Sequence, residues 1–209
     1  MKRHVFLFFF LLVNLSVFAQ DKIKVACVGN SITEGHGIEA GQKYPDHLQR
    51  LLGDAYEVKN YGVGGRTLLK KGDYPYWKEA KYQQVLQWNP DIVVIKLGTN
   101  DSKPQNWQYK ADFKKDYVAF IKSFKKLKSK PKIYICKPMP AYRVNFRINP
   151  AVIKDEQLAL IEQIARKAKV QIIDLYTPFL GKDNLAPDGI HPTGEGAALI
   201  AQEVYGAIK

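Results

Sequence analysis

The chain has 209 residues, of which 46% are hydrophobic and 25% charged, and 32 Lys and Arg against 20 Asp and Glu give a formal net charge of +12. These proportions are typical of a globular protein and exclude a long disordered chain, a collagen and a multi-span membrane protein. The length fits one domain or two small ones, and two cysteines are too few for a disulfide scaffold or a cysteine-rich zinc module.

The first 19 residues have the pattern of a secretory signal peptide. A basic start at residues 1–4 precedes an apolar run over 5–13, and Ala19 is a small residue where a signal peptidase would cut. An uncleaved membrane anchor is the alternative, although the apolar stretch is short for a membrane span. Cleavage would leave a domain of residues 20–209 with a formal charge of +10, exported to the periplasm or outside the cell.

The remaining chain alternates between strand and helix patterns. Apolar runs bounded by turn residues predict five strands, at 23–28, 56–61, 91–97, 132–136 and 170–175. Apolar residues at helical spacing predict helices at 44–52, 82–88, 113–127, 150–169 and 195–208. This alternation predicts an α/β domain with a parallel sheet covered on both faces. Cys27 and Cys136 lie inside strand-like runs, so we expect two buried thiols.

Polar turns follow most of the predicted strands. Sites in parallel sheets form at the carboxyl ends of the strands, so these turns are the places to search for chemistry. The turns are 29–33 (GNSIT), 60–67 (NYGVGGRT), 98–101 (GTND) and, before the last helix, 188–192 (DGIHP). The fourth strand is followed by 137–140 (KPMP), which carries no obvious catalytic residue type.

The residues in these turns fit acyl transfer. Ser31 stands at a strand-to-helix turn, His191 is a candidate base, and Asp188 is placed to orient its imidazole. A tetrahedral intermediate needs hydrogen-bond donors around its oxyanion. The backbone N–H groups of Ser31 and Gly65 and the side-chain amide of Asn100 are three candidate donors.

Each motif has a plainer interpretation when taken alone. Ser31 or Thr33 would be a helix cap, 100–101 a turn, and His191 a solvated loop residue. The occurrence of four such signals in order, at four loops on one edge of one sheet, favours the catalytic interpretation.

Two further histidines are rival bases. His36 follows Ser31 closely and is a candidate for lining the pocket, whereas His47 lies within a predicted helix and is expected to be structural. Neither has an Asp three residues upstream. No group of His, Cys, Asp and Glu has the spacing of a metal site, so we predict no required metal or other cofactor.

With these four blocks in order, the sequence resembles the SGNH hydrolase superfamily, also called GDSL esterases and lipases, over nearly the whole chain after residue 19. The G-D-S block appears as 29–31 with Asn30 in place of Asp, the G-x-N-D block is complete at 98–101, and the D-x-x-H block is 188–191. The glycine-rich block falls at 62–67.

The resemblance implies a flavodoxin-like three-layer α/β/α sandwich with a five-stranded parallel sheet in the order 2-1-3-4-5. It also implies a catalytic triad of Ser31, His191 and Asp188, and an oxyanion hole formed by Ser31, Gly65 and Asn100. Gly64 is the alternative match to Gly65.

The substrate is less well defined by the sequence. The G-N-S-I-T form resembles members that act on carbohydrate esters, and candidate substrate-binding residues in nearby loops are Arg66, Tyr74, Trp77 and Arg143. An aromatic, partly basic cleft would suit a sugar, including an acidic one; the alternative is that these aromatic residues only pack a loop. The dense lysines at 122–132 are interpreted as a solvated helix end and not as a nucleic-acid surface.

We therefore predict an exported serine esterase that hydrolyses acetyl or other short-chain acyl esters on carbohydrates. The alternatives are a lysophospholipase or thioesterase of the same family, and an inactive carbohydrate-binding protein on the same fold. The expected partner is a small-molecule or glycan ester, with no nucleic acid and no stable membrane insertion after signal cleavage. The sugar, the ester position and the oligomeric state do not follow from the sequence.

Overall fold

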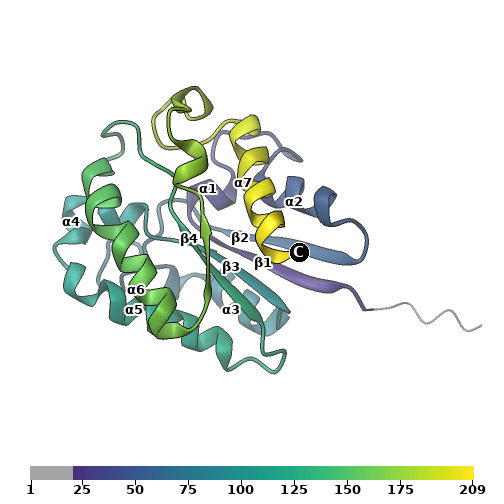
Figure 1. The fold of residues 1–209 in the computed structure, drawn as a ribbon. Coiled ribbons are helices and arrows are strands. Elements are labelled where there is room, and N and C mark those ends of the chain that lie inside the picture. The colour runs from purple at the N-terminus through teal and green to yellow at the C-terminus, as the bar shows by residue number, and fades with distance from the viewer. Residues whose placement is uncertain (1–20) are drawn as a thin grey trace, which may run out of the picture.

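A computed structural model describes residues 21–209, and the expected signal peptide lies outside the described residues. Its centre is a five-stranded, all-parallel sheet in the order β2-β1-β3-β4-β5 (Figure 1). The strands are β1 (Ile23–Gly29), β2 (Tyr56–Gly62), β3 (Ile92–Lys96), β4 (Lys132–Lys137) and β5 (Gln171–Asp174). The strand order and the α/β class expected from the sequence are thereby confirmed.

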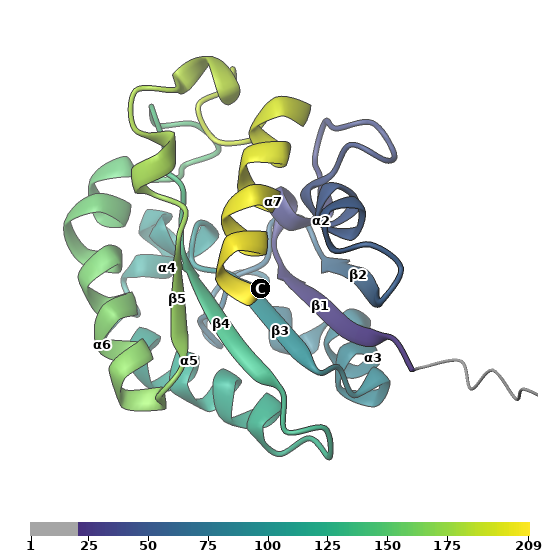
Figure 2. The same ribbon diagram turned by 45° about the vertical axis from the view of Figure 1, so that its right-hand side comes forward.

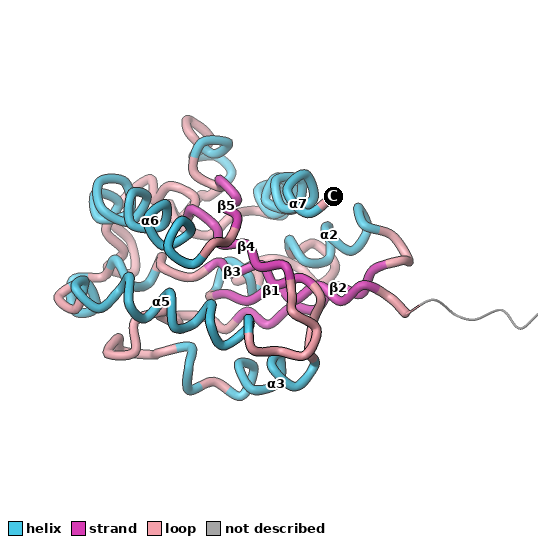
Figure 3. Tube along the Cα trace, turned by 60° about the horizontal axis from the view of Figure 1, so that its bottom comes forward, coloured by secondary structure: helices cyan, strands magenta, loops and turns pink. Residues whose placement is uncertain are grey.

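Helices cover both faces of the sheet, which gives three layers (Figures 2 and 3). One face carries α2 (Tyr44–Leu52) and α7 (Gly194–Ile208), and the other carries α3 (Ala80–Trp88), α5 (Lys110–Lys125) and α6 (Leu158–Ala168). Two four-residue helices, α1 (Ser31–Glu34) and α4 (Pro104–Trp107), follow β1 and β3. Short 3-10 or π turns are η1 (Tyr76–Lys78), η2 (Asn100–Ser102), η3 (Val152–Gln157), η4 (Thr177–Phe179) and η5 (Asp183–Leu185).

The side-chain alternation of the strands divides the apolar core into two halves. All five residues of β3 are buried, as expected for a central parallel strand with both faces covered. Val93 and Ile95 pack toward α3, α5 and α6, whereas Ile92 and Val94 pack toward α2 and α7. Each half of the core therefore joins one helical layer to the sheet.

The two cysteines lie in this core. Cys27 and Cys136 are both buried and free, which confirms the expectation of two buried thiols. Burial raises the pKa of each thiol to about 12, so both are protonated and unreactive at neutral pH.

The helix predicted over 150–169 is present in the structure, but its winding changes along its length. Val152–Gln157 is π-helical and continues without a break into α6, which begins at Leu158. At the end of this turn the side chain of Gln157 is fully buried and donates a hydrogen bond to the carbonyl of Gly98, at 2.9 Å. The turn therefore ties the helix to the loop that follows β3.

Candidate active site

The first candidate residue, Ser31, is the first residue of α1, directly after β1. The helix is capped by Asn30, whose Oδ1 accepts a hydrogen bond from the N–H of Ile32 at 3.2 Å. The interpretation of Ser31 or Thr33 as the cap is therefore wrong, because Asn30 fills that role. The Ser31 hydroxyl is left free for another partner.

Two glycines let α1 lie directly on the strand ends. A Cβ atom at Gly29 would lie 2.1 Å from Oγ1 of Thr33, and one at Gly62 would lie 2.1 Å from the backbone nitrogen of Glu34. Real Cβ atoms do not approach other atoms so closely, so any side chain at these positions would displace α1. The glycines thus fix the height of Ser31 above the sheet.

The three predicted triad side chains form one chain of hydrogen bonds. Oγ of Ser31 lies 2.9 Å from Nε2 of His191, and Nδ1 of His191 lies 2.7 Å from Oδ2 of Asp188. The other oxygen of Asp188 accepts hydrogen bonds from the backbone N–H groups of Ile190 and His191, both at 2.7 Å. An ionised carboxylate is an acceptor only, so Nδ1 carries the proton and Nε2 is the free base that accepts the Ser31 hydroxyl.

The environment supports these protonation states. Burial alone would raise the pKa of Asp188, but hydrogen bonds from His191 and Ile190 outweigh it and hold this pKa below its ordinary value. For His191, burial lowers the pKa most, and the nearby His36 and Lys96 lower it further, against the raising effect of Asp188. The net result is a pKa below the ordinary 6.5, so His191 is neutral at pH 7.

The candidate oxyanion donors lie around the same hydroxyl. Asn100, in η2, lines one cavity together with Ser31, Gly64 and Gly65. Nδ2 of Asn100 donates one hydrogen bond to the carbonyl of Arg66, at 3.1 Å, which fixes the plane of the amide. Gly65 has a φ of +76°, in the left-handed region that favours glycine. Both glycines line the cavity, and the choice of Gly65 as the donor stays a prediction.

A buried carboxylate holds the glycine-rich loop in place. Asp101 accepts hydrogen bonds from the backbone N–H groups of Leu68, at 3.0 Å, and Leu69, at 2.7 Å. Burial raises the pKa of Asp101 to about 6, even though these two bonds favour the ionised form. The motif after β3 therefore fixes this loop through two neighbouring side chains, because Asn100 and Asp101 both form hydrogen bonds with its backbone.

The cavity at the triad is small and has both polar and apolar walls. Its volume is about 270 Å³. Besides the residues already described, it is lined by His36, Lys103, Phe146 and Ile148. The ring centroid of His36 lies 4.5 Å from that of His191, and the centroid of Phe146 lies 5.3 Å from it. The suggestion that His36 lines the pocket therefore agrees with the structure.

Three of these wall residues were missed from the sequence. Phe146 and Ile148 belong to the long loop after β4, the one strand end without an obvious catalytic residue type, and Lys103 follows η2. A weak signal exists in the loop, because Val144 and Phe146 are large apolar residues among polar neighbours, and both are exposed. Exposed apolar side chains mark a binding surface when they gather into a patch, whereas single ones are common on any protein surface.

The four predicted substrate-binding residues do not line the cavity. Arg66 forms an ion pair with Glu79 at 2.8 Å, and Trp77 donates its ring N–H to the carbonyl of Leu68 at 2.7 Å. Arg143 donates to the carbonyl of Pro187, and Tyr74 is exposed beside the Arg66 guanidinium. Their binding role stays a prediction and concerns only parts of a substrate that extend beyond the cavity.

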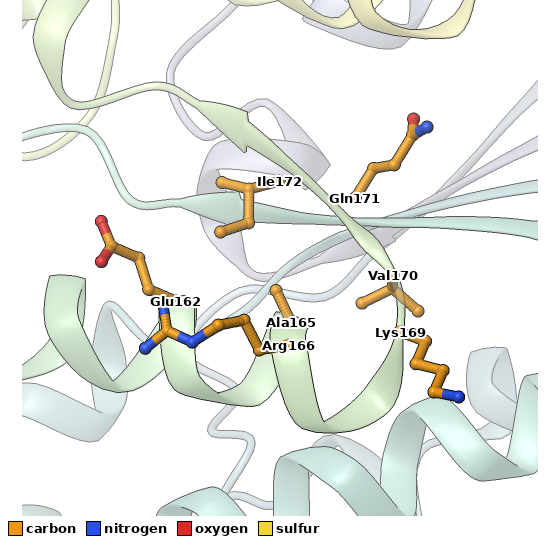
Figure 4. A pocket seen from close by; sticks show the side chains of 7 residues that line it. All are labelled: Glu162, Ala165, Arg166, Lys169, Val170, Gln171 and Ile172. Carbon is orange, nitrogen blue, oxygen red and sulfur yellow. The ribbon is translucent and has the colours of Figure 1, made fainter.

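A larger cavity, of about 610 Å³, lies between α6 and β5 (Figure 4). It is lined by Arg166 and Lys169 near the end of α6 and by Gln171 at the start of β5. The amino end of β5 is the opposite edge of the sheet from the triad, and no residue of the triad lines this cavity. It therefore has no part in the candidate active site.

Within residues 21–209, no three His, Cys, Asp or Glu side chains lie close enough together to hold a metal ion. No helix in this described part of the chain is long and apolar enough to cross a membrane.

Comparison with known proteins places these features in a family context. Residues 27–199 match the model of the GDSL-like lipase/acylhydrolase family. An acetylxylan esterase from Xylanibacter ruminicola is 45% identical over an alignment of 210 positions. The alignment covers 91% of this chain and 44% of that protein, so the chain spans under half the length of this relative. An acetyl xylan esterase crystal structure is similar with a TM-score of 0.73 at 25% identity, covering 90% of this chain and 100% of the other. A carbohydrate acetylesterase from Sinorhizobium meliloti shares the fold, with a TM-score of 0.68 at 18% identity over 90% and 100% of the two chains.

Proposed function

Because the chain belongs to the GDSL-like lipase/acylhydrolase family, we propose that it is an exported serine esterase that removes acetyl or other short acyl groups from carbohydrates. The observation that carries this proposal is the hydrogen-bonded chain from Ser31 through His191 to Asp188 at the wall of a cavity. The acetylxylan esterase relative supports the carbohydrate part, although it is more than twice as long as the matched region. A cavity of about 270 Å³ is slightly below the usual size of ligand pockets and favours a short acyl group.

The reaction begins when Oγ of Ser31 attacks the ester carbonyl and its proton moves to Nε2 of His191. The carbonyl oxygen becomes an oxyanion, which accepts hydrogen bonds from the N–H groups of Ser31 and Gly65 and from the Asn100 amide. The bond to the sugar oxygen then breaks, and His191 returns the proton to that oxygen. Asp188 stays ionised throughout and stabilises the imidazolium.

Water completes the reaction. His191 takes a proton from a water molecule, whose oxygen attacks the acyl-serine carbonyl and forms a second oxyanion. Collapse of this intermediate breaks the bond to Oγ of Ser31, which recovers the proton from His191. The products are the free sugar hydroxyl, the carboxylic acid and the unchanged enzyme.

The test is hydrolysis of short and long p-nitrophenyl esters, followed by acetate release from acetylated xylan. Ser31→Ala should lower the rate by several orders of magnitude, whereas Ser123→Ala, on α5 with its hydroxyl bonded to the carbonyl of Phe120, should keep it. A strong preference for long chains would favour a lysophospholipase or thioesterase. Absence of hydrolysis of every ester would indicate a carbohydrate-binding protein without activity.

Export is the second part of the proposal and is supported by the pattern of residues 1–19. Protein recovered from the periplasm or the medium of an expressing bacterium should begin at Gln20. Recovery of the intact chain in the membrane fraction would instead indicate an uncleaved anchor.

A further inference from the structure

A second histidine, His36, is hydrogen-bonded to the backbone of the nucleophile Ser31. His36 follows α1, and its backbone N–H donates a hydrogen bond to the carbonyl of Ser31, at 2.9 Å. Gly35, in the left-handed conformation with a φ of 86°, donates to the same carbonyl at 2.9 Å. The turn thus places the His36 ring against the His191 ring, with centroids 4.5 Å apart.

The ring nitrogens of His36 are available to form hydrogen bonds with a ligand. Among residues 21–209, no side-chain hydrogen bond or ion pair uses its ring nitrogens, whereas the ring of His47 is bonded to Arg50 at 2.9 Å. His36 is exposed and lines the cavity. Apart from the triad and the oxyanion donors, His36 and Lys103 are the polar side chains of the cavity wall, and the ring of His36 lies against that of His191.

This position matters for a sugar ester. The oxygen that leaves with the sugar must reach Nε2 of His191 to receive its proton. On a sugar ring the oxygen of the neighbouring hydroxyl lies roughly a hydrogen-bond length, about 3 Å, from that leaving oxygen. That hydroxyl then lies within about 6 Å of Nε2, in the cavity that His36 and His191 line together with their ring centroids 4.5 Å apart.

We propose that His36 binds the free hydroxyl next to the ester, so that the site selects sugar residues that carry an acyl group beside an unesterified hydroxyl. The proposal rests on the esterase function proposed above and adds a substrate class to it. A site that hydrogen-bonds a substrate hydroxyl discriminates against an analogue that lacks it, because a polar group of the site is then left unpaired.

The experiment compares two methyl xylosides, the 2-O-acetyl ester with a free 3-hydroxyl and its 3-deoxy counterpart, with p-nitrophenyl acetate as an ester without a sugar. The wild-type protein should prefer the free-hydroxyl ester by about 5- to 10-fold in kcat/KM. His36→Phe keeps an aromatic ring but no hydrogen bond, and should bring this ratio close to one. His36→Gln should restore part of it, and His47→Phe should leave it unchanged.

Three results would overturn the proposal. The first is a kcat/KM ratio near one in the wild-type protein, and the second is an unchanged ratio in His36→Phe. The third is an equal loss of kcat/KM on all three esters together with a shifted pH profile, which would mean that His36 acts only through His191.

Binding to Ser31→Ala separates this proposal from the esterase function. If no ester is hydrolysed, the esterase function fails, but the dissociation constants of the two xylosides for Ser31→Ala still test His36. Tighter binding of the free-hydroxyl xyloside, lost on adding His36→Phe, supports the proposal, and equal binding overturns it.

Discussion

Asp188 bonds His191 twice, with Oδ1 accepting the backbone N–H and Oδ2 facing Nδ1 of the ring, each at 2.7 Å. The backbone bond fixes the carboxylate, and the ring bond fixes the tautomer of the imidazole. Asp188→Asn keeps the shape of the side chain but removes the charge that selects the proton on Nδ1. We expect kcat to fall by about 10³- to 10⁴-fold, measured on a short p-nitrophenyl ester, with the exposed Asp183→Asn as the control.

The pH dependence follows from the protonation of His191. Since it acts as a base only when unprotonated, kcat/KM falls as the pH decreases through its pKa, which lies below 6.5 mainly because of burial. The acid midpoint of the kcat/KM profile is therefore expected below pH 6.5, with little change between pH 7 and 8. Burial raises the pKa of Asp101 to about 6, so loss of its charge in mildly acidic solution should weaken the loop that it holds and add to the fall in kcat/KM. A midpoint above 6.5 would contradict this assignment.

The close approach of α1 to β2 makes Gly62 a sensitive position. Gly62→Ala places a methyl group on the backbone of Thr33 and Glu34, so it should cost about 1–3 kcal/mol of the free energy of unfolding or more and displace Ser31. Urea unfolding and kcat/KM should both report the loss. Gly206→Ala, in α7 with open space around its Cβ position, is the matched control and should stabilise the protein by roughly 0.5–1 kcal/mol. Equal stability of the two variants would mean that α1 adjusts freely.

Asp101 is predicted to support the oxyanion loop without touching substrate. Asp101→Asn leaves one acceptor oxygen for the N–H groups of Leu68 and Leu69 and turns an NH₂ group toward one of them. The free energy of unfolding should fall by about 1–3 kcal/mol, and kcat/KM should fall with it because Gly64 and Gly65 lie in the same loop. Asp112→Asn, which breaks a surface pair with Lys71, should change neither. Unchanged stability of Asp101→Asn would show that the loop is held by other contacts.

Lys96 is a buried cation at the end of β3. Its side chain is 2% exposed, Nζ has no hydrogen-bond partner among the described residues, and burial lowers its pKa from 10.5 to about 8. Between these two values the unfolded chain binds more protons than the folded one, so the free energy of unfolding rises with pH, by about 3 kcal/mol over this window.

Lys96→Met should therefore stabilise the protein at pH 7 and remove this rise. The measurement is urea unfolding at pH 7 to 10.5, with Lys122→Met on the exposed side of α5 as the control. A rise that persists in Lys96→Met would assign it to another group.

The sequence predicts the five strands to within a residue or two: β1, β3 and β4 are apolar runs that the fold buries, and the two edge strands β2 and β5 are half-buried and bounded by turn residues. The observed strands end at slightly different residues from the predicted ones, because backbone hydrogen bonds determine where a strand ends. Both β1 and β2 extend one residue further, to Gly29 and Gly62. These glycines make room for α1. The helix α1 itself is absent from the prediction, since four residues are too few to show a helical period.

Some residues of the candidate site could be predicted from the sequence and others could not. Ser31, Asn100, Asp188 and His191 belong to motifs whose spacing is visible in the chain, and the structure brings them together. Phe146 and Lys103 carry no such spacing, because the wall of a cavity is decided by how loops pack and not by a local pattern. A lysine is rarely buried without a partner, so the residue type favours an exposed position for Lys96, and only the structure shows that its side chain lies in the core.

Ser31 and His191 are 160 residues apart, and they meet only when β1 and the segment before α7 have both been placed. A working centre can therefore assemble only after the chain has been synthesised and folded through His191, and a fragment truncated before position 188 lacks both the base and its partner. If the chain is exported unfolded, as the proposal above implies, it is inert toward esters inside the cell and becomes active only when Ser31 and His191 meet on the far side of the membrane.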